Sequence, residues 1–268
     1  MPRLSRPDGV EIRWDRWGEG PVVLIVPHWS AVARVFEPLT AELARDHQVV
    51  RYDARGTGES SPRGPHDMKT GAADLEAVIE AAGGPAVAIA IGDALNRAVR
   101  VAARRPDLLA DVVGVAAVPI GWESLRGTES LLASRVVVSA FMEMLGTDYR
   151  GALRTVMTAA NPQMDEEELR ARIQEQVDYC PQEVAVERIR AWVADDAAEE
   201  GRRIGSRLWT VTSPGAAGPW FPSIDEMERI MVELLPEARR EVIEDGIVSR
   251  PDLTAGIVRR ITAPLRAS

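Results

Sequence analysis

Carboxylate side chains follow two of the apolar runs in this sequence, at the points where those runs end. Asp93 comes directly after "AVAIAIG", and Glu244 and Asp245 come directly after "REVI". A carboxylate pressed against aromatic side chains loses solvation, so its pKa rises and it can act as an acid or a base near neutral pH. A structural explanation is also open. In it Asp93 caps the following helix, and Glu244 and Asp245 form a solvated turn before Gly246.

The elements that must position these side chains alternate between strands and helices. Short runs rich in β-branched residues are bounded by turn residues and separated by helical stretches, which predicts an α/β fold with a mostly parallel sheet covered by helices. The expected strands lie in VEIRWDRWG, VVLIVP, QVVRYD, AVAIAIG, DVVGVAAVP, LWTVTSP and REVIEDG. The expected helices are Arg34 to Arg45, Ala72 to Ala82, Asn96 to Arg105, Ile224 to Leu235 and Asp252 to Ile261.

The strand pattern stops between about Trp122 and Arg203, where the sequence is helical in character throughout. Its acidic run "DEEE" is typical of a helix N-terminus, where negative charge opposes the positive end of the helix dipole. We therefore predict a helical cap, residues 122–203, inserted into a core formed by residues 1–121 and 204–268.

The stretch "VVLIVPHWSAVARVFEPLTAELARDHQVVRYDARGTGESS" resembles the α/β-hydrolase superfamily, and the resemblance covers nearly the whole chain. Its most specific part is the tight turn from Tyr52 to Ser60, whose glycines permit a positive φ. The resemblance implies the α/β-hydrolase fold, a mostly parallel twisted sheet flanked by helices with a helical cap. It also implies that Asp53 and Arg55 organise loops.

The nucleophile of that superfamily stands in Gly-x-Ser-x-Gly, on a strained turn between a strand and a helix. The register GDALN puts Ala94 in the nucleophile position and the bulky Asn96 where a small residue belongs. The register AIGDA is counted back from "AARRPDLL". It has the small residues Ala90 and Ala94 on both sides and puts Gly92 in the nucleophile position, where a positive φ causes no strain. We favour this second register. A further slip that would make Asp93 a nucleophile of the dehalogenase type removes the small flanks.

The other two members of the hydrolase triad can be sought in the same way. "LWTVTSPGAAGPWFP" contains no carboxylate, and Gly218 is nearest to the position of the acid. "REVIEDGIVSRPD" contains Glu244 and Asp245 but no histidine. The resemblance therefore predicts a member that lacks the serine, the acid and the histidine. Charge-relay hydrolysis should be negligible, and a serine alone should not restore it.

The resemblance also implies a pocket above the carboxyl ends of the strands and beneath the cap. His28 takes the place of a loop histidine that shapes the oxyanion region, and it joins Asp93 and Glu244 as a candidate catalytic residue. Arg97 either neutralises a carboxylate or faces solvent. The candidate substrate-binding residues are Trp29, Ser30, Gly92, Ala94, Trp122, Trp220 and Asp245.

Three functions are compatible with these residues. The first is non-hydrolytic acid/base chemistry, such as elimination, isomerisation or cyclisation, on a small and fairly apolar metabolite. The second is a catalytically inactive protein that binds a ligand or a partner. The third is an ester hydrolase with an atypical catalytic set, in which Ser30 or Ser213 would be the nucleophile.

Charge and composition narrow the choice of partners. The formal net charge of -9, with no cluster of Lys and Arg, disfavours nucleic acids and anionic membranes. One cysteine and three histidines leave no internal disulfide and almost no basis for a structural zinc site, and we expect no cofactor. No apolar run suits a signal peptide or a membrane span, so we expect a cytoplasmic protein with a small-molecule partner. A homodimer formed through the cap is a further option.

Overall fold

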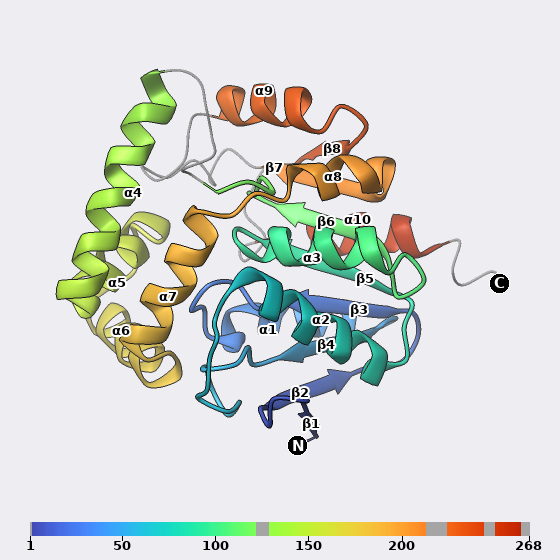
Figure 1. The fold of residues 1–268 in the computed structure, drawn as a ribbon, viewed down its shortest axis with the longest axis horizontal. Helices are drawn as coiled ribbons and strands as arrows, with labels where there is room; N and C mark the ends of the chain where they lie inside the picture. Colours follow the sequence, from blue (N-terminus) through green and yellow to red (C-terminus); the bar gives the residue numbers. More distant parts are fainter. Residues whose placement is uncertain (1, 122–128, 213–223, 244–249, 264–268) are drawn as a thin grey trace.

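The computed structural model describes residues 2–121, 129–212, 224–243 and 250–263, with the backbone alone at 129–135, 160 and 224. Its centre is an eight-stranded sheet in the order β1-β2-β4-β3-β5-β6-β7-β8 (Figure 1). Strands β3 to β8 run parallel, whereas β1 and β2 form an antiparallel edge. The strands are Arg3–Ser5, Glu11–Trp17, Val22–Val26, Gln48–Tyr52, Ala86–Ile91, Leu109–Val115, Leu208–Thr212 and Arg239–Val242.

The central strands are apolar on both faces because helices cover both. Every residue of β3 is buried. Leu24 and Ala88 share a core cluster with the helices on one face, whereas Ile25 and Ile89 share another with the helices on the opposite face. A parallel sheet buried on both sides gives such continuous apolar strands rather than alternating ones.

Two groups of helices form these outer layers. On one face lie α2 (Met68–Ala82), α3 (Ala94–Arg104) and α8 (Ala198–Ile204), and on the other lie α1 (Glu37–Leu43) and α10 (Pro251–Thr262). A short 3-10 turn, η1 (Ala33–Phe36), precedes α1, so the helix expected over Arg34 to Arg45 is divided. Helix α2 begins four residues before the expected start, because the side chain of Asp67 accepts a hydrogen bond from the Thr70 N–H.

The remaining helices include four that form a separate layer beside the sheet: α4 (Glu129–Thr147), α5 (Tyr149–Ala160), α6 (Glu166–Tyr179) and α7 (Gln182–Val193) (Figure 1). They share their own apolar cluster with part of α9 (Ile224–Leu234). The acidic run caps α6 as expected, since the Asp165 side chain accepts from the Glu168 N–H. The division into residues 122–203 and a core stays a prediction. Helix α8 packs on α3 and contributes Ile204 to the core cluster of the sheet.

The cap contacts the core through the loops that follow the parallel strands. Tyr179 donates its hydroxyl to Asp53 Oδ1 after β4, and the Gln176 side chain donates to the Ser30 carbonyl after β3. The candidate site residues in these loops therefore lie at the junction of core and cap. No helix within the described part of the chain is long and apolar enough to cross a membrane.

Candidate active site

The turn between β5 and α3 is the centre of the candidate site. Gly92 has a φ of +52°, between the end of β5 at Ile91 and the start of α3 at Ala94. The small flanking residues Ala90 and Ala94 are fully buried, which lets strand and helix approach closely. The structure thus places at Gly92 the positive φ that the favoured register assigns to it.

His28 lies directly over Gly92. A Cβ atom added to Gly92 would come within 3.1 Å of His28 Nδ1 and 3.2 Å of His28 Cε1. The imidazole ring therefore stands beside the point from which a side chain at position 92 would leave the backbone. The side chain of His28 is 33% exposed, so the ring is open to a small molecule on one side.

Asp93 orients this imidazole. Its Oδ1 lies 3.0 Å from His28 Nδ1 and accepts a hydrogen bond of 2.7 Å from the Trp29 N–H. Its Oδ2 accepts from Arg97 Nη2 at 2.9 Å. An ionised carboxylate can only accept, so the His28 proton belongs on Nδ1 and the Nε2 lone pair is left free. No hydrogen bond to Nε2 is formed by any residue in the described ranges.

The charge state of Asp93 differs from the sequence-based expectation. Burial alone raises the pKa of this carboxyl, which is only 3% exposed, but the Arg97 guanidinium and His28 outweigh burial and hold its pKa well below the usual range. The expectation of a raised pKa is therefore wrong, and Asp93 is a permanent anion at neutral pH. The alternative prediction, that the Asp93 side chain caps the following helix, is wrong too. Asp93 stands at the N-cap of α3, but its side chain forms no capping hydrogen bond and points back to the loop after β3.

Arg97 neutralises this carboxylate rather than facing solvent. It lies one turn along α3 from Asp93 and is only 3% exposed. Its Nη2 also donates to the Pro27 carbonyl at 2.6 Å. Arg97 therefore holds the end of β3 and the start of α3 together around a buried negative charge.

Trp29 and Ser30 connect this centre to the cap. Trp29 Nε1 donates to the Ala185 carbonyl on α7 at 3.0 Å, and the indole meets the Phe141 ring edge-on with centroids 5.7 Å apart. Trp29 has a φ of +33°, which costs a bulky residue about 1–2 kcal/mol. Ser30 is 1% exposed, and no residue of the described chain accepts or donates a hydrogen bond at its Oγ. The Ser30–His28 pair that an atypical esterase would need is therefore not formed.

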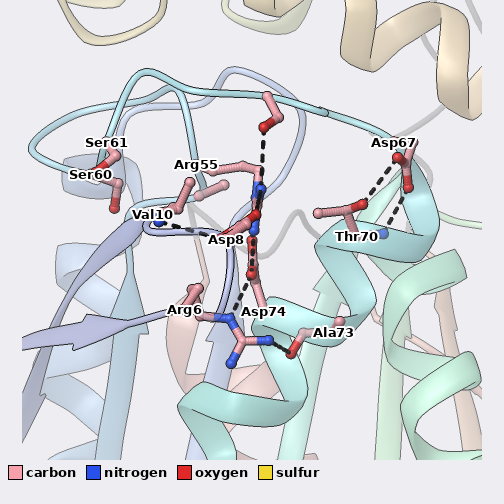
Figure 2. A network of polar contacts seen from close by, with 12 residues as sticks. Arg6, Asp8, Val10, Arg55, Ser60, Ser61, Asp67, Thr70, Ala73 and Asp74 are labelled. Carbon is pink, nitrogen blue, oxygen red and sulfur yellow. Dashed lines mark hydrogen bonds and ion pairs between the residues drawn. The ribbon is translucent and has the colours of Figure 1, made fainter.

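A second polar cluster, the Asp74 network, is shown in Figure 2, and its Arg55 and Asp74 line the same cavity as Arg97. Asp74 accepts two hydrogen bonds from Arg55, at 2.7 and 2.8 Å, and one from Arg6 at 3.0 Å. Arg55 Nη1 also donates to Asp8 at 2.8 Å. Arg55 is thus part of a closed set of ion pairs that fixes the loop after β4.

Several candidate residues lie outside the described ranges. Trp122, Trp220, Glu244 and Asp245 are among them, as is Gly218. Ile243, the described residue that precedes Glu244 in the sequence, follows β8 and is buried. Among described residues, no group of three or more His, Cys, Asp or Glu side chains is arranged to hold a metal ion.

Sequence reasoning missed Arg188, on α7, which is 5% exposed and lies close enough to Asp93 to help lower its pKa. The segment "VERIRAW" contains two arginines with no feature that separates the buried one from the exposed one. Tyr52 and His66, which line a cavity next to Arg97, were also not identified from the sequence as candidate functional residues. Each is an ordinary residue in sequence whose surroundings come from distant segments.

A model of the alpha/beta hydrolase family matches residues 22–256. The chain belongs to this family. Among solved structures, an esterase from Exiguobacterium antarcticum is similar, with a TM-score of 0.79 and 18% identity over 97% of this chain and 98% of its own. A bromoperoxidase from Bacillus anthracis has a TM-score of 0.75 and 17% identity over 94% of each chain. At these identities the likeness concerns the α/β-hydrolase fold alone.

One curated protein adds a partial sequence match. Polyketide synthase ThaQ from Burkholderia thailandensis is 35% identical to this chain over 89 residues. The match covers 33% of this chain and 4% of ThaQ. This α/β-hydrolase chain thus spans only a small part of the length of that relative.

Proposed function

We propose that this protein carries out non-hydrolytic acid/base chemistry on a small, fairly apolar metabolite, with His28 as the proton-transfer group and Asp93 as the residue that positions it. The observation that carries the proposal is the place of the His28 ring, which lies over Gly92 with Nδ1 on a buried, ionised Asp93. Proton transfer by a positioned side chain needs this combination of a fixed ring and a free nitrogen.

The proposed step is a proton relay at one nitrogen. His28 Nε2 takes a proton from a substrate carbon or hydroxyl, and the resulting imidazolium is stabilised by the carboxylate of Asp93. The proton then returns to another atom of the substrate, which gives an isomerisation or cyclisation, or to a leaving group, which gives an elimination. Glu244 and Asp245 stay candidates for a second proton-transfer group, because they follow Ile243 at the end of β8.

Hydrolysis through a covalent intermediate is not part of this proposal. Gly92 has no side chain, and a Cβ there would lie 3.1 Å from His28 Nδ1, so the ring would have to shift by a few tenths of an ångström to admit one. A serine hydrolase needs the reverse arrangement, with a side-chain oxygen at this turn and a histidine that approaches it. We infer that the chain lacks the serine, the acid and the histidine of the usual triad.

A second candidate function, ligand binding without chemistry, is favoured by one observation. The loop that carries His28 is fixed on two sides, because Trp29 binds Asp93 through its backbone and Ala185 of the cap through its indole. A loop held this firmly suits a closed binding pocket. In this alternative the protein retains a small molecule or a partner and releases it unchanged. In both alternatives we propose a cytoplasmic protein, and a homodimer through the cap stays a proposal.

The test is native mass spectrometry of the wild-type protein and the His28→Gln variant after incubation with an extract of small metabolites. The proposal predicts that the wild type depletes one compound and produces a new mass. It predicts that His28→Gln binds the same compound and leaves it unchanged, because the amide can hydrogen-bond to Asp93 but cannot carry a proton. Retention of an unaltered compound by both proteins would overturn the enzymatic proposal in favour of a binding protein.

A further inference from the structure

A cavity lies between the cap and the core, next to Arg97. Its polar lining includes Tyr52 at the end of β4, His66 before α2, Arg97 on α3 and Arg188 on α7. The volume open to the centre of a water molecule is about 20 Å³. That is enough for one or two waters or for one small polar group.

The cavity gathers polar atoms that have no partner. Tyr52 Oη, His66 Nδ1, Arg97 Nε and Arg188 Nη2 are buried, and none of them is hydrogen-bonded within the described part of the protein. A buried polar atom without a partner costs about 1–3 kcal/mol, so such atoms are rare in native structures. All four atoms belong to residues that line the cavity, so this lining has more hydrogen-bonding capacity than the protein itself uses.

Arg188 is the most unusual of these residues. It forms no hydrogen bond or ion pair with any described residue, although it is only 5% exposed. Burial and the nearby Arg97 guanidinium both lower the pKa of Arg188. Arginines are almost never buried without a partner, because an unpaired buried cation is strongly destabilising. A negatively charged occupant would remove this penalty.

The carboxylates around the cavity do not fill this role. Both oxygens of Asp74 are bound by Arg55 and Arg6 in the Asp74 network. Both oxygens of Asp67 are bound by Thr70 at the start of α2. Arg97 is neutralised by Asp93. The charge of Arg188 is thus the one in this lining that no described carboxylate balances by a direct contact.

We propose that this cavity is a carboxylate-binding site, with the Arg188 guanidinium as the principal donor and Arg97 Nε and Tyr52 Oη as additional donors. The planar fork of arginine matches the two oxygens of a carboxylate. The small volume suits such a group better than a tetrahedral phosphate. The site rests on the contact between cap and core, and it exists whether or not His28 performs the proposed chemistry.

The experiment measures thermal unfolding in increasing sodium acetate, against the sodium salt of a bulky sulfonate at equal ionic strength. The proposal predicts a saturable rise in the Tm of the wild type of about 2–4 °C in acetate alone. Arg188→Gln should lose this rise. Arg190→Gln, which removes an exposed arginine from the same helix, should keep it.

Further variants and control anions test whether the acetate response comes from binding at Arg188. In acetate-free buffer, Arg188→Gln should be at least as stable as the wild type, because it removes an unpaired buried charge. Tyr52→Phe should weaken the acetate response, and His28→Gln should leave it intact. An equal acetate response in Arg188→Gln would overturn the proposal. A wild-type response to acetate no larger than the response to the sulfonate would also overturn it, because water alone would then fill the cavity. Chloride acting as well as acetate would overturn the assignment to a carboxylate.

Discussion

The Asp74 network and the cluster around Asp93 are two sets of charges, each built around a buried carboxylate at the same end of the sheet, and they differ in how completely they are paired. In the Asp74 network, Arg55 donates from Nε, Nη1 and Nη2 to Asp74 and Asp8 (Figure 2). Around Asp93, the carboxylate is fully bound, but His28 Nε2, Arg97 Nε and Arg188 have no hydrogen-bond partner among described residues.

This difference distinguishes charged groups that stabilise the fold from charged groups that are available to bind a ligand. A closed set of ion pairs has no capacity left for a ligand, so its role is to fix the loop after β4 against α2. In an incompletely paired set, a ligand can supply the hydrogen bonds and counter-charge that the protein does not provide. The comparison predicts opposite consequences when members of the two clusters are changed.

The largest effect on stability is expected from Asp74→Asn. The substitution leaves the buried Arg55 with only the exposed Asp8 as a counter-charge and removes the carboxylate that pairs with the half-buried Arg6, which should lower the free energy of unfolding by about 3–5 kcal/mol. Urea denaturation followed by circular dichroism measures this loss. Glu76→Gln, two residues further along α2 in a more exposed ion-pair group, is the matched control and should change stability by less than about 1 kcal/mol. Similar losses in both variants would contradict the structural role of the network.

A smaller loss, of about 2–3 kcal/mol at neutral pH, is expected from Asp93→Asn, because an amide keeps some of the hydrogen bonds but not the charge. The pKa of Asp93 is depressed in the folded protein, so its ionic contribution is complete above the ordinary carboxyl pKa of 3.8 and is lost as the pH falls through the folded-state value. The difference in unfolding free energy between wild type and variant should therefore shrink as the pH falls below about 4. A difference that instead grows with acidity would show that the pKa is raised.

The smallest effect is expected on esterase activity from Gly92→Ser. If the cluster were a hydrolase that lacks only an oxygen, this change would create activity toward an activated ester. The structure predicts no gain above the wild type, because the His28 nitrogen nearest the new Cβ, at 3.1 Å, is Nδ1, whose proton is bound by Asp93, so it has no lone pair to take the serine proton. Gly92→Ala controls for the disturbance of the turn. Ester turnover in the serine variant alone would contradict the account.

The fold was predictable because it depends on patterns that lie within short segments. The apolar runs of β3 and β5 and the glycines of the turn after β4 are visible in sequence, and the α/β-hydrolase fold follows from their order. The position of Gly92 was also accessible, since the small residues beside it and the end of the following helix fix the register. Helix α2 was placed too late because the capping role of Asp67 depends on its backbone conformation.

The electrostatics of the site were not predictable in this way. His28 and Asp93 lie 65 positions apart, and only the parallel pairing of β3 with β5 brings them together. The pKa of Asp93 was expected to rise because burial was foreseen, but Arg97 and His28 reverse the shift. Arg188 comes from the cap, whose docking onto the core no local pattern specifies.

The most direct test of the account is the tautomer of His28, read from the ¹⁵N chemical shifts of its imidazole in the folded wild-type protein under conditions where the ring is neutral. The account predicts a proton on Nδ1, bound by Asp93, and a bare Nε2 that shifts when a ligand enters the site. In Asp93→Asn this preference should weaken. A proton found on Nε2 in the wild type would contradict the account, because His28 would then have no lone pair available for the proposed proton transfer.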